Sequence, residues 1–354
     1  MKNIKWKKLF KGNVGTYSII IIAYVILQVL TMTGSLSSLM KGLLVPLCTY
    51  AILAISLNLV VGILGELSLG HAGFMCVGAF TSAFFSKCTE DTITNSLIRF
   101  ILAIIVGAVC AGLFGILIGI PVLRLKGDYL AIVTLAFGEI IKNVVNVLCI
   151  GRDSRGFRFA INNTIGLVED DGEMIVKGAQ GITGTPNDSN FTIGILLVLL
   201  SIFIVTNLIK SRSGRAIMAI RDNRIAAESV GINITRYKLL SFTISAALAG
   251  IAGVLYAHNL STLTASPKNF GYNMSIMILV FVVLGGIGNI RGSIISAVLL
   301  TLLPELLRFL NDYRMLIYAV VLIVMMLINW SPKCKELKER FSLKRLFARK
   351  KKEA

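Results

Sequence analysis

Long apolar runs recur along the whole chain, separated by short segments that carry glycine or charge. A helix needs about 20 apolar residues to cross the hydrocarbon core of a bilayer. Ten runs reach or approach that length: 15–33, 43–64, 67–86, 98–120, 129–150, 191–209, 239–258, 273–289, 293–307 and 315–330. The pattern therefore predicts an all-α integral membrane protein with about ten transmembrane helices over 15–330, between a basic N-terminus (1–14) and a basic tail (331–354).

Two glycine-rich links interrupt the apolar pattern and leave almost no room for a loop. The first lies within Asn58–Phe74, which reads NLVVGILGELSLGHAGF, and the second, Gly285–Ser293, reads GGIGNIRGS. Irregular backbone at membrane depth is tolerated where protein or a water-filled cavity satisfies its polar groups. Each link is therefore either a tight hairpin whose polar residues face water, or a break in a discontinuous helix beside a transport path. The exact span count around 62–73 and 285–293 depends on which interpretation holds.

Small and polar residues of the first link are candidates for a translocation path or a gate. They are Gly65, Glu66, Ser68, Gly70 and His71. The glycines permit a sharp change of direction and a close approach of backbones. The polar side chains would then sit at the break, where they can meet either a cavity or solvent.

A second polar group lies inside the run 129–150. Glu139, Lys142, Asn143 and Asn146 fall on one face of a helix. Ionisable groups at membrane depth are costly and usually face protein or water. Glu139 and Lys142 could pair within the helix as a structural ion pair, or Glu139 and Asn143 could line a translocation path. The sequence leaves both open.

Composition supports a membrane protein and limits the meaning of the positive charge. Hydrophobic residues make up 55% of the chain, charged residues only 15%, and the mean hydropathy is +0.80. Soluble domains carry about a quarter charged residues. In a soluble chain, the excess of 36 Lys and Arg over 18 Asp and Glu would suggest a nucleic-acid-binding protein. In this chain the positions of the basic residues instead indicate which segments lie on the cytoplasmic side of the membrane.

Basic residues gather in alternate segments between the apolar runs. With the N-terminus inside, the inner segments hold 25 of the 36 Lys and Arg, as the positive-inside rule requires. We therefore expect both termini in the cytoplasm and the segment 151–190 outside. The first run carries no cleavage site after it and is interpreted as a retained span. The basic tail then contacts anionic lipid, and we expect no nucleic-acid partner.

Residue types that carry catalysis are sparse. Six Cys are scattered without a CxxC pair, and two His cannot build a metal site alone. The chain contains no GxxxxGK[ST] and no HExxH pattern. We therefore expect a non-catalytic subunit that binds no cofactor or metal.

The longest inner segment, Lys210–Lys238, is amphipathic. Its apolar positions Ile217, Ile220, Ile225 and Val230 alternate with charged residues, and Gly231 is placed to end a helix. A short helix held between two spans favours a docking site for a cytoplasmic partner. A helix lying on the bilayer surface is the alternative.

Small residues recur every four positions in two of the runs. One set is Gly107, Ala111, Gly115 and Gly119, and the other is Ala249, Gly253 and Ala257. Close backbone approach favours helix association in lipid. We therefore expect two helix–helix seams in a compact bundle.

Three of these stretches together resemble one family. They are SLNLVVGILGELSLGHAGFMCVGAF, LRLKGDYLAIVTLAFGEIIK and SGRAIMAIRDNRIAAESVGINITRYKLLSFTISAALAGIAGVLYAH. The combination resembles the LivM-type permease subunit of branched-chain amino-acid ABC importers, over roughly residues 43 to 310. GITGTP, Gly181–Pro186, is consistent with it.

The resemblance implies a plasma-membrane subunit that forms the path for Leu, Ile or Val. It implies four kinds of partner: a second homologous permease, two cytoplasmic ATPases that bind ATP-Mg, an extracytoplasmic binding protein and the lipid bilayer. By match to the family's loop, the residues that would couple to the ATPases are Arg221, Asp222, Ala226, Ala227, Glu228 and Gly231. The chain has AAES followed by VG, which fits a loose variant of the family's EAA motif.

Other cargo and other mechanisms remain open on the sequence. Similar permeases carry urea or short amides. An ion-coupled secondary carrier would use Glu139 as its ion site, although the docking loop would then have no purpose. A membrane-embedded enzyme lacks any convergent catalytic set in the sequence.

Overall fold

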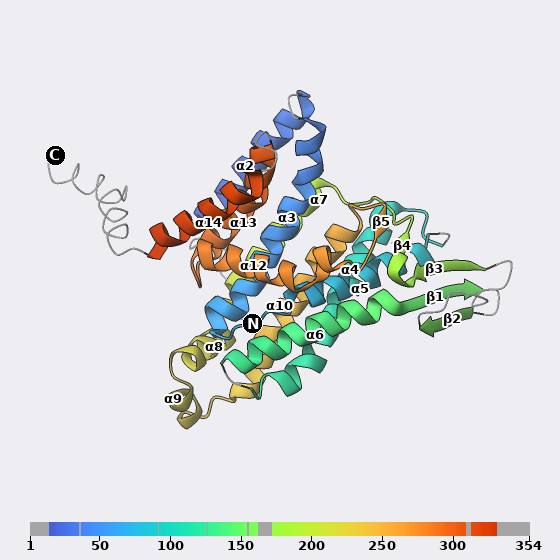
Figure 1. Cartoon of the computed structure of the whole chain (residues 1–354). Coiled ribbons are helices and arrows are strands. Elements are labelled where there is room, and N and C mark those ends of the chain that lie inside the picture. Colours follow the sequence, from blue (N-terminus) through green and yellow to red (C-terminus); the bar gives the residue numbers. More distant parts are fainter. Residues whose placement is uncertain are drawn as a thin grey trace, which may run out of the picture. The chain divides into compact units, whose positions relative to one another are not determined.

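Helices dominate the computed structural model, which describes residues 14–34, 37–90, 92–125, 127–153, 156–161, 172–308 and 313–330 (Figure 1). The chain divides into two compact units, Met1–Val298 and Leu299–Ala354. The predicted basic tail, and all but the last residue of the predicted basic N-terminus, lie outside the described residues.

All ten apolar runs form helices. In the first unit these are α2 (Val14–Met32), α3 (Ser38–Asn58) with a following π-helix η1 (Leu59–Leu64), α4 (His71–Cys88), α5 (Ser96–Val122), α6 (Asp128–Val147), α7 (Phe191–Lys210), α10 (Ile234–Ala257), α12 (Tyr272–Gly285) and the start of α13 (Ile290–Leu306). Shorter helices η2 (Gly178–Gln180), α8 (Arg212–Asp222), α9 (Arg224–Ser229) and α11 (Pro267–Phe270) connect them.

Seven helical segments of the described chain are long and apolar enough to cross a membrane. They are Gly15–Met32, Ser38–Leu64, Ser96–Val122, Asp128–Val147, Phe191–Lys210, Ile234–Ala257 and Pro267–Gly285. Helix α4 carries His71 and Lys87 near its ends, and α13 and α14 have 17 residues each. The architecture is that of a multi-pass membrane protein, and the count of ten spans stays a prediction.

Helix α10 lies at the centre of the first unit, against α3, α4 and α5. Glycines and alanines let these backbones approach closely. A Cβ at Gly250 would come within 2.5 Å of the Ala111 Cβ, and one at Gly115 within 2.6 Å of the Ala246 Cβ. Gly253 packs on the Met75 carbonyl of α4. The two predicted small-residue seams are confirmed, one between α5 and α10 and the other between α10 and α4.

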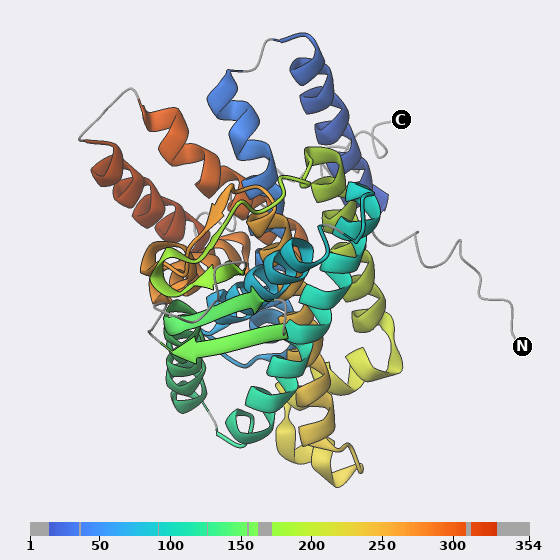
Figure 2. The same cartoon turned by 90° about the vertical axis from the view of Figure 1, so that its right-hand side faces the viewer.

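The expectation of an all-helical protein was wrong in one region. Helix α6 ends at Val147 rather than near 150, and strand β1 (Leu148–Asp153) follows directly. It pairs with β2 (Gly156–Ile161) and β3 (Glu173–Lys177) in the order β2-β1-β3, and a second small sheet joins β4 (Ile182–Thr183) to β5 (Thr262–Leu263). Figure 2 shows the strands of the larger sheet side by side in green.

The sequence carried a signal for this sheet. Large apolar residues at 157, 159 and 161 alternate with Arg158 and the small Ala160, and such alternation is the pattern of a strand with two different faces. The antiparallel register pairs Ile150 with Phe159 and Leu148 with Ile161. Directly paired residues share a face, so one face of the sheet is apolar from β1 to the edge strand.

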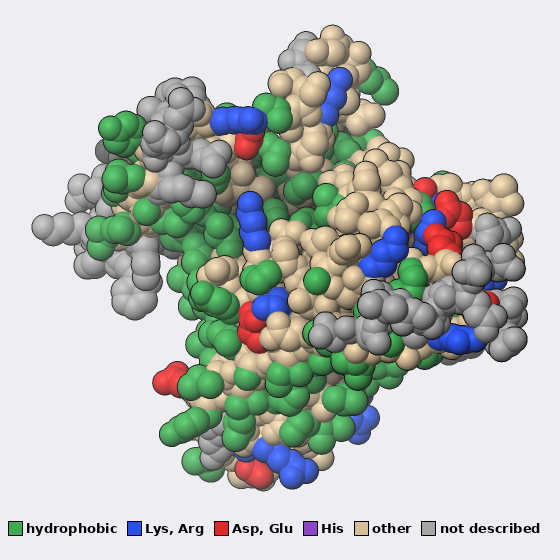
Figure 3. All heavy atoms as spheres, turned by 45° about the vertical axis from the view of Figure 1, so that its right-hand side comes forward, with side chains coloured by type: hydrophobic (Ala, Val, Ile, Leu, Met, Phe, Trp, Pro, Cys, Tyr) green, Lys and Arg blue, Asp and Glu red, His purple; other side chains and the backbone are tan. Residues whose placement is uncertain are grey.

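The sheet and the pair α8–α9 lie at opposite ends of the first unit (Figure 1). In Figure 3 hydrophobic side chains cover much of the lower half of the visible face, and Lys and Arg gather at its lower tip. This separation agrees with helices that cross a membrane between the two ends.

The second unit is described through the last part of α13 and through α14 (Arg314–Trp330). Glu305 pairs with Arg308 at 3.0 Å, one turn apart. Glu305 therefore has a partner one turn away on its own helix segment.

Candidate functional site

The first glycine-rich link is a break between two helices. Helix α3 widens into the π-helix, Gly65 turns the chain with a φ of 79°, and α4 begins at His71. Ser68 and His71 are buried and Glu66 is largely buried, so the interpretation as a hairpin in water does not fit. A π-helix often marks a functional position. Gly65 and Leu67 are exposed, at the end of the unit that carries α8.

The second glycine-rich link meets the first. Asn58, the last residue of α3, accepts a hydrogen bond from the Gly288 backbone N–H through Oδ1 and donates to the Ser293 hydroxyl through Nδ2, both at 2.9 Å. Gly286 and Gly288 have positive φ values of 95° and 81°. Asn58 is fully buried and thus joins the two breaks. Sequence reasoning missed it, although an amide inside an apolar run was a signal.

The backbones of the two breaks are also in direct contact, at Gly62 and Gly288. A Cβ on Gly62 would collide with the Asn58 side chain and with the Gly288 backbone nitrogen. We call Asn58, Gly62, Gly288 and Ser293 the Asn58 clasp. Only glycine at position 62 allows the π-helix and the second break to touch in this way.

Arg221, at the end of α8, turns toward the first break. Its Nη1 donates to the Gly62 carbonyl at 3.2 Å, and Gly65 packs against its side chain, since a Cβ there would lie 2.6 Å from Arg221 Cγ. The guanidinium also pairs with Asp222 at 2.8 Å. The predicted coupling loop is therefore in direct contact with the predicted gate.

A second link between the loop and the break is ionic. Glu66, next to Gly65, pairs with Lys238 of α10, and both side chains are largely buried. A buried ion pair is costly to break because the remaining charge loses its partner. The break is thus held from α8 by Arg221 and from α10 by Lys238.

His71 begins α4 inside the bundle. Ser245 donates its hydroxyl proton to the Ser56 carbonyl at 2.5 Å, so its oxygen accepts from His71 Nε2 at 2.9 Å. This fixes the proton on Nε2 and leaves Nδ1 as an acceptor. Within the described residues, neither His71 Nδ1 nor the Ser68 hydroxyl has a hydrogen-bond partner.

The start of α4 packs tightly on α6. Gly70 lies against the Thr134 carbonyl, and a Cβ on Gly73 would come within 2.7 Å of Gly138 Cα. The Leu69 N–H donates to the Thr134 hydroxyl at 3.0 Å. Glycine at position 70 is therefore required by contact with a neighbouring helix.

Glu139 joins α6 to the start of α12. Its Oε2 pairs with Lys142 at 2.5 Å, which confirms the predicted pair within the helix. Its Oε1 accepts the Tyr272 backbone N–H at 2.6 Å and so caps the first turn of α12. Asn143 lies one turn further along α6 and is exposed, so the structure does not bring it into the same network.

The predicted docking loop forms two helices rather than one helix ending at Gly231. The chain breaks at Asn223, whose side chain accepts the Ala226 N–H at 3.0 Å and caps α9. Because the break turns the second helix, the apolar residues separate. Ile217, Ile220 and Ala227 are buried, whereas Ile225 and Val230 are 81% and 75% exposed.

The other predicted coupling residues lie on this outer part of the loop. Asp222, Ala226 and Glu228 are exposed, and Gly231 has a φ of 82° with open space around it. Ala227 instead packs in a small core with Ile220 and Ile234. The structure thus divides the predicted set into an exposed group, a buried alanine, and Arg221, which is exposed but reaches the Gly62 carbonyl with Nη1.

Polar side chains also cluster near the sheet end of the unit. Asp188 accepts from Ser96 at 2.6 Å and pairs with Arg99 at 3.3 Å. Nearby, His258 lies 2.8 Å from the Ser86 hydroxyl. Among the residues that the structure describes, no group of three or more His, Cys, Asp or Glu side chains is placed to hold a metal ion.

Comparison with known proteins places most of the membrane region, from α3 to α14, in one family. The family model described as branched-chain amino acid transport system / permease component matches residues 39–328. The LivM permease proteins of high-affinity branched-chain amino acid transport systems from Salmonella typhimurium and Escherichia coli are each 36% identical over 293 residues, which is 80% of this chain. LivH of Escherichia coli is 25% identical over 287 residues, covering 79% of this chain and 89% of LivH.

The chain spans 66% of the length of the two LivM relatives, just under two thirds. No solved structure matches it. A permease family agrees with the apolar helices described above, which are long enough to cross a membrane. The chain belongs to the family of permease components of branched-chain amino acid transport systems.

Proposed function

We propose that the chain is the transmembrane permease subunit of an ATP-binding cassette importer and forms part of the path for Leu, Ile or Val. The observation that carries this proposal is the hydrogen bond from Arg221 to the Gly62 carbonyl. It connects a helix suited to docking with the point where both interrupted helices meet. A docking helix that contacts a gate can transmit the movement of a partner.

The docking surface is the α8–α9 pair. Ile225 and Val230 expose apolar surface beside Asp222 and Glu228, a combination that fits the groove of a cytoplasmic protein. The partner would be an ATPase that carries ATP-Mg, because this chain has no nucleotide-binding motif. The remaining partners would be a second homologous permease and an extracytoplasmic binding protein that docks at the sheet end.

Two side chains would carry the movement inward. Arg221 holds Gly62, and Lys238 holds Glu66, so a shift of α8 relative to α10 acts on both sides of Gly65. The Asn58 clasp would pass the shift to the second break. The first and second links would then move together as the path opens and closes.

The exposed polar residues of α6 support a path on that side of the subunit. Asn143 is exposed and Glu139 is partly exposed on a helix that meets the criteria for a membrane span. Contact with lipid would be costly for both. They would instead face the path or the second permease subunit, with the N-terminus of the chain and α8–α9 in the cytoplasm.

Uptake by whole cells tests the proposal. Cells that lack this chain are assayed for labelled leucine and labelled urea, then complemented with the wild type, Arg221→Ala or Arg236→Ala. Arg236 is exposed at the start of α10 and serves as the matched control. We expect leucine uptake to return with the wild type and the control, and to fall about tenfold with Arg221→Ala, since a charged hydrogen bond is worth that factor.

The other outcomes separate the alternatives. Rescue of urea uptake alone would keep the permease and change the cargo to urea or short amides. Leucine uptake that survives depletion of ATP but collapses with the ion gradient would replace the importer by a secondary carrier.

A further inference from the structure

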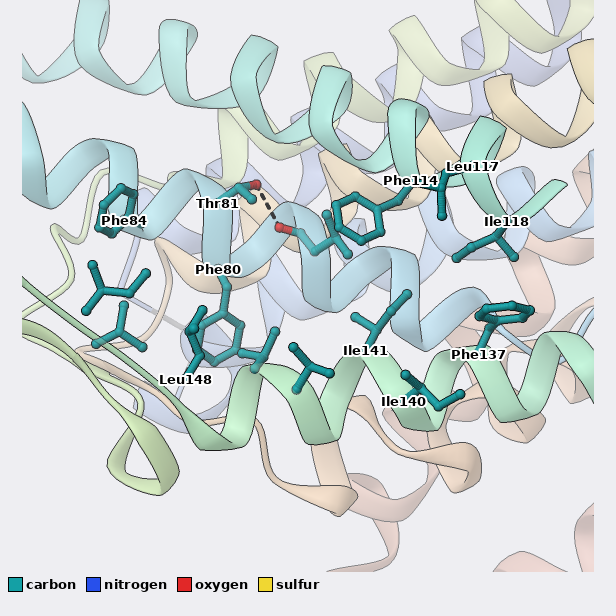
Figure 4. A pocket seen from close by; sticks show the side chains of 15 residues that line it. Phe80, Thr81, Phe84, Phe114, Leu117, Ile118, Phe137, Ile140, Ile141 and Leu148 are labelled. Atoms are coloured by element: carbon teal, nitrogen blue, oxygen red, sulfur yellow. Dashed lines mark hydrogen bonds between the residues drawn. The ribbon is translucent and has the colours of Figure 1, made fainter. Parts of the chain in front are cut away.

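An apolar groove lies between α4, α5 and α6, and residues of β1 and β3 line one end of it (Figure 4). Its volume is about 410 Å³. The lining residues are Val77, Phe80, Thr81, Phe84, Phe114, Leu117, Ile118, Phe137, Ile140, Ile141, Val144, Val145, Leu148, Ile150 and Val176. Thr81 is the one with a hydroxyl, and that hydroxyl donates to the Val77 carbonyl of its own helix at 2.7 Å. The groove therefore offers only hydrocarbon to an occupant.

The groove opens sideways from the helix bundle. Leu117 of α5 and Ile140 of α6 stand on its rim and are 65% and 53% exposed. Both helices meet the criteria for membrane spans. The opening is therefore at membrane depth and on the outside of the subunit, away from Arg221 and the Asn58 clasp.

The groove covers half of the membrane. Along α6 its lining runs from Phe137 to Val145, a rise of about 12 Å at 1.5 Å per residue, and Leu148 and Ile150 of β1 extend it further. The hydrocarbon core is about 30 Å thick, so this is the depth of one leaflet. Helix α6 ends at Val147 and the sheet begins there, which places the groove in the leaflet nearer the sheet.

The apolar face of the sheet continues the groove. Leu148 and Ile150 line it, and their cross-strand partners Ile161 and Phe159 are exposed on the same face. Phe157 of the same strand lies with its ring centroid 5.8 Å from that of Phe84 in the groove wall. These exposed phenylalanines extend the apolar lining of the groove beyond the end of α6.

Charged groups surround the mouth. Arg152, two residues beyond Ile150, donates from Nη1 to the Cys88 carbonyl at 3.3 Å, one turn of α4 beyond Phe84. Lys87 lies 3.4 Å from both Glu90 and Glu173, and Glu173 is the cross-strand partner of Arg152. The exposed Arg152 can donate to a phosphate. Lys87 balances one of the two carboxylate charges, and Glu173, whose side chain is 68% exposed, keeps its second oxygen for an ammonium group.

We propose that this groove binds one acyl chain of a zwitterionic phospholipid, phosphatidylethanolamine, from the leaflet on the sheet side, with the phosphate at Arg152. A transmembrane helix is about 10 Å wide. A helical segment as long as the groove would fill several times 410 Å³, whereas an extended hydrocarbon chain is narrow enough to enter. The assignment goes beyond the proposed transport function and does not depend on the cargo.

Retention of lipid by the purified complex tests the site. The wild type, Val144→Trp, Ile132→Trp and Arg152→Gln are expressed with their partners, purified in a mild detergent, and analysed for bound phospholipid by native mass spectrometry. Val144 stands on the rim of the groove, and Ile132 is exposed on the same helix outside the groove. We expect one phosphatidylethanolamine per chain in the wild type and in Ile132→Trp.

The groove variant should lose that lipid. The indole of Val144→Trp would occupy part of the groove and exclude methylene groups of the acyl chain. Exclusion of two methylene groups lowers the affinity for the lipid about tenfold, so this variant should retain at most a tenth as much lipid as the wild type. Arg152→Gln should keep the acyl chain but lose the preference for phosphatidylethanolamine over phosphatidylglycerol. Equal retention in Val144→Trp and Ile132→Trp would overturn the proposal.

A second measurement does not require the tryptophan variant to fold. A nitroxide is placed at Leu117→Cys or, as control, at Ile105→Cys on the exposed face of α5, with the chain's own cysteines replaced by serine. The complex is reconstituted in vesicles of phosphatidylethanolamine and phosphatidylglycerol. Similar collision rates with O₂ at the two positions support lipid in the groove. A much lower rate at Leu117 would mean that protein covers it, and the proposal would be wrong.

Discussion

Asn58 and Gly288, 230 positions apart in the chain, form a hydrogen bond of 2.9 Å from the Gly288 N–H to the side-chain oxygen Oδ1 of Asn58. One stands at the end of an apolar helix before a π-helix, and the other stands in a glycine turn between α12 and α13. This contact therefore couples the break after α3 to the break between α12 and α13. Movement at either link requires this contact to adjust.

The side chain of Asn58 should matter through both of its hydrogen bonds. Asn58→Ala leaves the Gly288 N–H and the Ser293 hydroxyl without this partner, and we expect a loss of about 1–3 kcal/mol of stability. Ser293→Ala removes only one of the two Asn58 bonds, together with the bond that the Ser293 hydroxyl donates to the Asn289 carbonyl. Thermal unfolding of the purified complex for both single variants and the double variant measures the coupling between them. Strict additivity of the two effects would contradict the clasp.

Gly62→Ala should be more damaging than an ordinary glycine substitution. The new Cβ would meet the Asn58 side chain and the Gly288 backbone, which cannot rotate away, so the helices must separate at a cost of about 1–3 kcal/mol. Gly42 of α3 has nothing within 4 Å of a built Cβ and provides the control. Equal melting temperatures for Gly62→Ala and Gly42→Ala would refute the close contact.

Gly70→Ala tests the packing of α4 on α6. Its Cβ would press on the Thr134 carbonyl, a backbone atom, so Thr134→Ala should not rescue it. Gly112→Ala, whose nearest neighbour is the Ala247 Cβ at 3.6 Å, should be tolerated. We expect the amount of folded complex in the membrane to fall only for Gly70→Ala, as quantified by size-exclusion chromatography of detergent extracts.

The Glu66–Lys238 pair should behave as a unit. Glu66→Gln or Lys238→Met alone leaves a largely buried charge without its partner and should cost about 3–5 kcal/mol. The double variant removes both charges and should recover much of that loss. Denaturation of the purified complex provides the four free energies. Full additivity of the single losses in the double variant would show that the ion pair does not hold the break.

The sequence predicted a large part of this architecture because the relevant signals are local. Apolar runs of membrane length located all ten helices, and glycine clusters located both breaks. The i,i+3 spacing of Glu139 and Lys142 predicted their ion pair, which measures 2.5 Å. Each of these features depends on neighbours within one or two turns, and hydropathy and helical spacing describe such neighbours well.

The small sheet and the division of the amphipathic loop into two helices had local signals that did not by themselves predict the structure. The alternation from Phe157 to Ile161 was present, but a strand needs a partner. The pairing of β1 with β3 joins residues as far apart in the chain as Cys149 and Lys177, which no local pattern connects. The amphipathic loop predicted one helix. The extended backbone of Asn223, which caps α9, divided it into two helices and exposed Ile225 and Val230.

By itself, then, the sequence determined which segments form the long apolar helices, where these helices break and which family's motifs they carry. Only the tertiary structure decided that Asn58 meets Gly288, that Arg221 reaches the Gly62 carbonyl, and that a groove of one leaflet's depth lies beside α6. These contacts join residues that are more than 150 positions apart in the first two cases. Their formation depends on how close two backbones come, which glycines permit but which no local pattern records.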